Sequence, residues 1–344
     1  MLRRRYIGSM VGAADRRRFE AAIRIAKEKG AIVTTHDMAD PDGLGSAFCI
    51  QRYISSLGGG ADIVTGQRTQ VSERLIQELG MDVLRWDDVS PSDVRPLIIV
   101  DTNTPALLGC IAKRGNPQLL VIDHHKKTPP SLDARFMISN EAAISACEMV
   151  ASLVPAGRIC KGGALALAVG IAGDSERLSY AERETLTIFQ KLLGISGATK
   201  QRIDDLAYPR WKPEMVSAIL NEMKNLRTET YRGRVIVVAS SSLEHPAILA
   251  DALRNLNVAI IAVLNDMGNA WYRISLRVEL KEAYINGIHA NALAMRLGKC
   301  LGMPKNLRGG GHIDKVGAVV RGTYSAIADM IVRIAKQAID SAPR

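Results

Sequence analysis

The sequence has few aromatic residues and only scattered cysteines. Phe, Trp and Tyr make up 4% of the 344 residues. The chain therefore has few aromatic rings with which to build a long groove that stacks successive bases of a single strand. The five cysteines are odd in number and form no C-x-x-C pair, which argues against a disulfide framework and against a thiolate metal site. We therefore expect the cysteines to have structural roles.

Long apolar runs are also missing. The longest nearly uncharged apolar stretch spans residues 162–173, which is shorter than the roughly 18–20 residues of a membrane-spanning helix. The basic start of the chain is followed by only a brief apolar patch before Arg16, Arg17 and Arg18, unlike a secretion signal. These features predict a cytoplasmic protein without a membrane segment.

The chain carries a strong excess of positive charge. A formal net charge of +10 favours anionic partners, because a positive field concentrates phosphate-bearing ligands at the surface. With so few aromatic residues, short oligonucleotides of RNA or DNA, or small nucleotides, are better candidates than long strands.

The order of elements indicates an α/β fold in two parts. Asp15 can cap a helix that ends near Lys29, and short β-branched runs then alternate with helical patterns at 31–35, 61–65, 97–100 and 119–122. This alternation predicts a parallel wound sheet in residues 1–195. A helical connector at 196–228 precedes a smaller mixed-sheet α/β domain at 229–344, with strands expected at 235–239, 258–264 and 271–278 and helices at 289–300 and 324–338.

Aspartate and histidine residues gather directly after apolar runs in the first half. Open parallel sheets form their ligand crevice at the carboxyl ends of the strands. Four clusters hold five aspartates and three of the six histidines: His36, Asp40 and Asp42; Asp101; Asp123, His124 and His125; and Asp174. A single aspartate after a strand is more often a helix cap or turn residue, but four clusters in equivalent positions favour a functional site.

The composition of the clusters points to metal chemistry. Crowded carboxylates repel one another and shift their pKa values unless cations neutralise them. Oxygen and imidazole ligands without cysteine suit manganese, magnesium or cobalt. Two divalent ions about 3.5–4 Å apart can activate a water and stabilise the leaving oxygen in phosphoester hydrolysis. The clusters therefore predict a two-metal hydrolytic site.

The pattern resembles the DHH phosphoesterase family, whose name records the triplet Asp123-His124-His125. The resemblance implies two divalent ions, with manganese expected and magnesium or cobalt as alternatives. One ion would be held by His36, Asp40 and Asp101, and the other by Asp42, Asp101, His124 and Asp174, so that Asp101 is shared. Asp123 would fix the orientation and tautomer of the ligating His124, and His125 would face the scissile phosphate as a donor or general acid. The family usually has Asp-Thr where this chain has Asp174-Ser175.

The second half is similar to the DHHA1 substrate-binding domain. Its motifs are matched by the strand residues Ser275 and Arg277 and by the basic glycine-histidine run Arg308, Gly309, Gly310, Gly311 and His312. Glycines without a Cβ let backbone N–H groups approach a phosphate, and an arginine can grip one with two hydrogen bonds. After His312 this chain has Ile313-Asp314-Lys315-Val316-Gly317, where the family commonly has small residues leading into a glycine.

Within the family, the length and motifs are most similar to stand-alone oligoribonucleases, called nanoRNases, that can double as 3′-phosphoadenosine-5′-phosphate phosphatases. Alternatives are a cyclic or linear dinucleotide phosphodiesterase and a single-strand exonuclease. A third alternative, from another class, is a nucleic-acid-binding module without catalysis. Association of two chains into a homodimer is left open.

Overall fold

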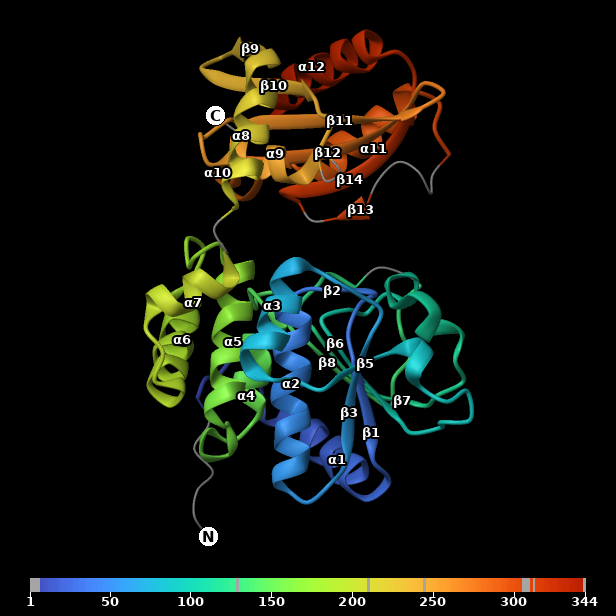
Figure 1. The fold of residues 1–344 in the computed structure, drawn as a ribbon, viewed down its shortest axis with the longest axis vertical. Helices are drawn as coiled ribbons and strands as arrows, with labels where there is room; N and C mark the ends of the chain where they lie inside the picture. The colour runs from blue at the N-terminus through green and yellow to red at the C-terminus, as the bar shows by residue number, and fades with distance from the viewer. Residues whose placement is uncertain are drawn as a thin grey trace. The chain divides into compact units, whose positions relative to one another are not determined.

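The computed structural model describes residues 7–127, 130–208, 211–243, 246–304, 310–311 and 313–342. The chain divides between residues 210 and 211 into two compact units, called here the N-terminal and C-terminal units (Figure 1). The division falls inside the segment 196–228 that the sequence indicated as a connector. Among the described residues, no helix combines the length and apolar character needed to cross a bilayer.

The N-terminal unit is built on a six-stranded sheet with the order β5-β3-β1-β6-β7-β8, and all its pairings are parallel. The chain moves outward from β1 to β3 and β5 and then returns to β6 on the other side of β1. The strand order therefore reverses between β1 and β6, which is where open α/β sheets bind ligands. The strands are β1 (Ala31–Thr34), β3 (Ala61–Thr65), β5 (Val83–Arg85), β6 (Leu97–Val100), β7 (Gln118–Asp123) and β8 (Phe136–Ser139); β2 (Met38–Ala39) and β4 (Gln67–Arg68) form a separate small pair.

Helices cover one face of this sheet, and short 3-10 segments and loops cover the other. Alternate strand residues such as Val33 and Ile98 join the core under the helices, whereas Ile32 and Ile99 join a smaller core on the opposite face. The helices are α1 (Ala13–Lys29), α2 (Pro41–Ser56), α3 (Gln70–Leu79), α4 (Ala146–Leu153), α5 (Lys161–Asp174), α6 (Arg183–Ser196) and α7 (Lys200–Ala207); the 3-10 segments are η1 (Trp86–Asp88), η2 (Pro105–Lys113) and η3 (Ala156–Arg158). The longest apolar run of the sequence is thus the buried central helix α5.

Glycines allow α2 and α5 to pack closely. A Cβ on Gly45 of α2 would lie 2.6 Å from the carbonyl oxygen of Ala166 in α5. A Cβ on Gly170 of α5 would lie 3.0 Å from Cα of Asp42 and would clash with Sγ of Cys147. The first turn of α2, with Asp42, therefore packs directly on the last turns of α5, which ends at Asp174.

The C-terminal unit has a mixed six-stranded sheet with the order β13-β14-β12-β11-β10-β9, in which only β10 and β11 are parallel. The strands are β9 (Arg227–Tyr231), β10 (Arg234–Ser240), β11 (Ile260–Gly268), β12 (Trp271–Val278), β13 (Gly310–Gly311) and β14 (Lys315–Arg321); the helical elements are α8 (Pro213–Glu222), η4 (Met223–Asn225), α9 (Pro246–Arg254), α10 (Leu280–Tyr284), α11 (Ala290–Cys300) and α12 (Tyr324–Ser341). Helices α11 and α12 share a core with one face, and α8 and α9 share a core with β10 and β11 on the other. The expected fold class, a parallel wound sheet followed by a smaller mixed α/β domain, is confirmed.

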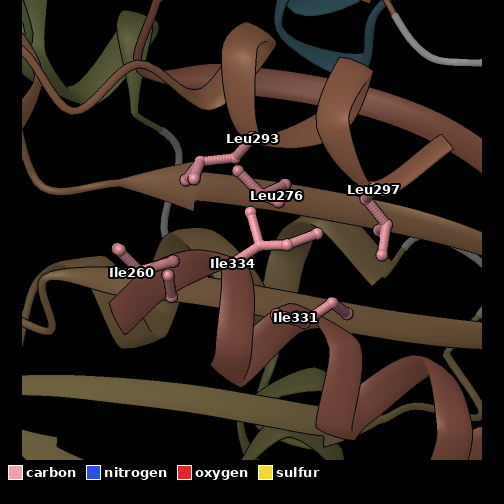
Figure 2. A pocket seen from close by; sticks show the side chains of 7 residues that line it. Ile260, Leu276, Leu293, Leu297, Ile331 and Ile334 are labelled. Atoms are coloured by element: carbon pink, nitrogen blue, oxygen red, sulfur yellow. The ribbon is translucent and has the colours of Figure 1, made fainter. Parts of the chain in front are cut away.

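A small cavity lies in the core between this sheet and the helices α11 and α12 (Figure 2). Its volume is about 10 Å³, and its lining is entirely apolar: Ile260, Leu276, Leu293, Leu297, Ile331, Ile334 and Ala335. A water needs roughly 10–15 Å³ and polar partners, so this space is a packing gap and not a ligand site.

We expect Gly170→Ala to destabilise the N-terminal unit by about 1–3 kcal/mol, because the added methyl would overpack the contact between α5 and α2. Gly162→Ala is the matched control in the same helix, since the nearest atom to its new Cβ would be 3.5 Å away. Urea unfolding of both metal-free variants, followed by circular dichroism, measures the difference. Equal stability of the two variants would show that the close helix contact is unimportant.

Candidate metal centre

The aspartate and histidine clusters meet at the carboxyl edge of the parallel sheet. His36 follows β1, Asp101 follows β6, and His124 follows β7, while Asp174 is the last residue of α5. Asp40 is the N-cap of α2, where its Oδ1 accepts hydrogen bonds from the backbone N–H groups of Asp42 and Gly43, both at 3.0 Å. The site therefore lies at the reversal of strand order between β1 and β6.

Asp101 is the centre of the arrangement. Its carboxylate is 2% exposed, and its two oxygens face different histidines: Oδ2 lies 3.3 Å from Nε2 of His36, and Oδ1 lies 3.4 Å from Nε2 of His124. The backbone has φ 60°, a left-handed conformation that costs a non-glycine residue about 1–2 kcal/mol. Backbone strain of this kind concentrates at functional sites.

Potential ligand atoms gather in three groups, and within each group they lie within 4.8 Å of one another. The first is His36, Asp40 and Asp101, the second is Asp42, His124 and Asp174, and the third is Asp101, His124 and His125. Nε2 of His124 lies 3.6 Å from Oδ2 of Asp174 and 3.9 Å from Oδ2 of Asp42. The six residues expected from the sequence as metal ligands thus come together, and Asp101 belongs to the first group and lies beside His124 of the second.

Buried polar atoms at the centre fit a pair of cations. Oδ1 of Asp101 and Nε2 of His124 are buried and make no hydrogen bond within the described part of the chain. Leaving such atoms unpaired costs about 1–3 kcal/mol each, and more for a charged group. Divalent ions coordinated by oxygen and imidazole would satisfy both atoms and neutralise the carboxylates.

Comparison with known protein families identifies the part of the chain that carries most of the aspartate and histidine clusters. Residues 31–171 match the model of the DHH family, N-terminal domain. These residues form a DHH-family domain.

Other relatives resemble the chain over most of its length. A Methanocaldococcus jannaschii protein described as uncharacterized is 23% identical over 298 residues, which cover 85% of this chain and 87% of that protein. The structure of an exopolyphosphatase-related protein from Bacteroides fragilis covers 96% of this chain and 97% of its own, with a TM-score of 0.74 and 18% identity. RecJ from Thermus thermophilus, solved in complex with Mn²⁺, has a TM-score of 0.52 and 15% identity over 95% of this chain and 55% of that chain. The two structures show a shared fold.

The DHH domain fixes the orientation of His124 through the backbone. Nδ1 of His124 lies 3.2 Å from the carbonyl oxygen of Ala143, so Nδ1 carries the proton that it donates and Nε2 points toward Asp101. The turn that carries this carbonyl is anchored by Asn140, whose N–H donates to the Asp123 carbonyl at 3.2 Å and whose Oδ1 accepts from Ala142 at 3.0 Å. Nδ2 of Asn140 donates to the carbonyl of Met10 at 2.9 Å, which ties the turn to a segment outside the matched family region.

Glu148 holds the other end of the same turn. Its side chain is fully buried, and Oε1 accepts a hydrogen bond from the Ile144 N–H at 2.8 Å. Its backbone N–H is bonded to Oγ of Ser145, the N-cap of α4. The sequence reasoning missed this residue, although Ser145-x-x-Glu148 has the spacing of a helix capping box.

The same helix start binds Asp42. The backbone N–H groups of Ala146 and Cys147 donate to Oδ2 and Oδ1 of Asp42 at 2.7 and 2.8 Å. A helix N-terminus stabilises a carboxylate because its N–H groups and dipole favour negative charge. Helix α4 therefore positions Asp42 directly, and the turn before α4 positions His124.

Asp123 orients His125. Oδ1 of Asp123 lies 2.8 Å from Nδ1 of His125, and Nδ2 of Asn103 donates to the other carboxylate oxygen and to the His125 carbonyl. Asp123 is fully buried. The expectation that it orients the ligating His124 is wrong, because Nδ1 of His124 is bonded to the Ala143 carbonyl and Asp123 is left to orient His125. Asn103 was also missed; its only sequence signal is its position two residues after Asp101.

The charges of the metal-free DHH domain are strongly coupled. Burial would lower the pKa of His36, but Asp101 and Asp40 outweigh it and raise the pKa to about 11. Burial likewise opposes the charged form of His124, yet Asp101, Asp174 and Asp42 raise its pKa to about 10. Burial and the charge of Asp101 raise the pKa of Asp42 to about 7. Protons thus occupy the cluster at neutral pH in the absence of metal.

The expected substrate residues lie in the C-terminal unit. Ser275 and Arg277 are on β12 and are 8% and 9% exposed, and Gly310 and Gly311 form β13. Nε of Arg277 is paired with Oδ1 of Asp251 at 2.7 Å, a partner that the sequence did not indicate. Arg308, Gly309 and His312 lie outside the described residues.

We expect Glu148→Ala to weaken Mn²⁺ binding by about 10–100-fold, because the turn that orients His124 would lose an anchor. Glu148→Gln keeps an acceptor oxygen for the Ile144 N–H in a side chain of the same shape, so this variant should retain binding within about threefold. Titration calorimetry measures both affinities, with circular dichroism as the test of folding and the exposed Glu182→Ala as the control. Unchanged affinity in a folded Glu148→Ala protein would show that the turn does not orient the histidine.

Metal binding should release protons and strengthen with pH. The raised pKa values mean that imidazolium at His36 and His124 stabilises the metal-free fold below pH 6.5, and that this contribution is lost as pH rises through about 10 to 11. Because metal ligands must be deprotonated, Mn²⁺ affinity should rise by up to about tenfold per pH unit for each proton displaced. Calorimetry at pH 7.5 in two buffers with different ionisation heats counts the protons. The absence of proton release would contradict this charge distribution.

Proposed function

We propose that this protein is a metal-dependent phosphoester hydrolase that acts on short oligoribonucleotides or on small nucleotides such as 3′-phosphoadenosine-5′-phosphate. The main support is the position of Asp101, whose two carboxylate oxygens face two separate groups of ligand atoms. A carboxylate shared in this way is suited to a pair of divalent ions. The DHH-family domain and its cluster of carboxylates and imidazoles agree with this chemistry.

The residues have separable tasks in this proposal. His36 and Asp40, with Asp101, would hold one divalent ion, and Asp42, His124 and Asp174, with Asp101, the other. Bound ions of this kind polarise a phosphoryl oxygen and neutralise the charge that develops on it. With Nδ1 directed at Asp123, His125 is assigned to the scissile phosphate through Nε2, as a donor to the leaving oxygen.

The C-terminal unit supplies positive charge for an anionic substrate. Residues 211–344 contain 18 Lys or Arg and 11 Asp or Glu, which is +7 of the chain's formal +10. Strand pairing places Ser275 beside Gly317 and Gly317 beside Gly310, so these three residues form one row across β12, β14 and β13. Ser275 and Gly310 are expected substrate residues, and Gly317 between them has no side chain. Backbone groups in such a row can be approached closely by a phosphate.

Two other phosphoester-hydrolysing activities fit the same site. A dinucleotide phosphodiesterase and a single-strand exonuclease would need the same ions and the same basic unit. A nucleic-acid-binding module without catalysis is less well supported, because all six predicted metal-binding side chains lie together.

The test is Mn²⁺-dependent hydrolysis of an RNA dinucleotide, an RNA 24-mer and 3′-phosphoadenosine-5′-phosphate. We expect the two small substrates to be cleaved much faster than the 24-mer, and Asp101→Asn to lower their turnover at least about 100-fold because the shared ligand is lost. The exposed Asp82→Asn is a control in the same unit. Fast cleavage of the 24-mer would favour an exonuclease, and full activity of Asp101→Asn would refute the proposed centre.

A further inference from the structure

The end of α5 leads into a turn with an uncommon backbone. Asp174 is the last residue of the helix, and among the described residues it belongs only to the group of ligand atoms with Asp42 and His124. Residues 176–178 follow with φ of 48°, 58° and 74°. None of the three is glycine, and residues with a side chain rarely adopt this left-handed conformation. Such a turn persists only where surrounding contacts hold it.

Ser175 ties the turn to α5 from within. It is fully buried, and its hydroxyl donates to the Ile171 carbonyl and accepts a hydrogen bond from the Leu178 N–H at 3.1 Å. The backbone N–H of Ser175 also donates to the Ile171 carbonyl, at 3.0 Å. The Asp174-Ser175 pair thus joins a candidate metal ligand to a residue that closes the helix end.

Tyr208 contacts the same helix end from α7. Its hydroxyl oxygen lies 2.9 Å from the carbonyl oxygen of Ala172 and 3.0 Å from that of Gly173, so one proton is shared between the two carbonyls. Carbonyls at the C-terminal end of a helix have no partner within the helix. Burial, followed by the charge of Glu176, raises the pKa of Tyr208, so the hydroxyl keeps its proton and donates it.

The ring of Tyr208 has a separate task. It packs against the core under the helices, and the guanidinium carbon of Arg177 lies 4.0 Å from the ring centroid. The backbone N–H of Arg177 donates to the Ala172 carbonyl at 2.9 Å. The ring therefore supports the left-handed turn, whereas the hydroxyl holds the carbonyls that directly precede Asp174.

Tyr208 also lies at the end of the N-terminal unit. It is the C-cap of α7 and stands close to the division between residues 210 and 211. Helix α7 packs against α5 (Figure 1). The last helix of the unit therefore meets the end of the helix that carries Asp174.

We propose that Tyr208 is a positioning residue for Asp174: its hydroxyl fixes the last turn of α5 and thereby sets the affinity of the ion that Asp174 helps to bind. The other ion should be unaffected, since His36 and Asp40 lie after β1 and at the start of α2. This inference rests on the proposed metal centre. It adds a residue that belongs to none of the four sequence clusters and lies outside the matched family region.

The experiment is a double-mutant cycle that measures Mn²⁺ binding to the full-length protein by titration calorimetry, without substrate. We expect Tyr208→Phe to weaken one of the two ions about 3–10-fold, as for one lost hydrogen bond, and to leave the other within about twofold. In Asp174→Asn protein the same change should cost less than about twofold, because the ligand that it positions is already altered. In Asp40→Asn protein the full loss should persist.

Tyr53→Phe is the matched control. It makes the same chemical change in α2 and keeps a ring stacked on Phe19, and it should alter the affinity of neither ion. Tyr208→Phe itself retains the ring beneath Arg177. Circular dichroism shows that each variant is folded.

Equal weakening of both ions, an additive loss in Asp174→Asn protein, or unchanged affinities in Tyr208→Phe would overturn the proposal. A wild-type protein that binds no Mn²⁺ would refute the metal centre, and this inference with it. Binding of Mn²⁺ without hydrolysis of any nucleotide would instead remove the proposed function and leave the role of Tyr208 intact.

Discussion

Electrostatic repulsion among buried carboxylates is the constraint on which the N-terminal unit depends. Asp42 and Asp101 are almost completely buried, and Asp40 and Asp174 lie in the same cluster. In the absence of metal, protonated His36 and His124 offset part of this charge, as their raised pKa values indicate. Divalent ions would replace those protons and satisfy the buried atoms that make no hydrogen bond. The fold concentrates negative charge where the proposed cations would bind.

The surrounding structure holds this charge in place through backbone contacts. The start of α4 binds Asp42, and the turn before it, between Asn140 and Glu148, orients His124. Gly170 lets α5 approach the first turn of α2 closely, so residues distant in sequence meet at one point. Because these contacts share a helix and a turn, a change in one of them should alter the positions of both Asp42 and His124, which belong to the same group of ligand atoms.

Much of this arrangement could be predicted from the sequence. β3, β6 and β12 were predicted to the residue. Short β-branched runs mark β3 and β6, and aromatic and β-branched residues that alternate with polar ones mark β12. The aspartates and histidines at the strand ends indicated the position of the site. β14 was not predicted because its glycine and flanking charges obscure the alternation. Asn103 and the pairing of Arg277 with Asp251 could not be foreseen, because each depends on a partner distant in the sequence. Glu148 was missed although its contacts with Ile144 and Ser145 are local and its spacing from Ser145 is that of a capping box.

The central claim is that one carboxylate, Asp101, is shared by two divalent ions. The most direct measurement is electron paramagnetic resonance during titration of the metal-free protein with Mn²⁺. Our account predicts two ions per chain and a magnetically coupled spectrum as the second ion binds, because a shared carboxylate holds the pair about 3.5–4 Å apart. Saturation at one ion per chain, or two ions that retain uncoupled six-line spectra, would contradict it.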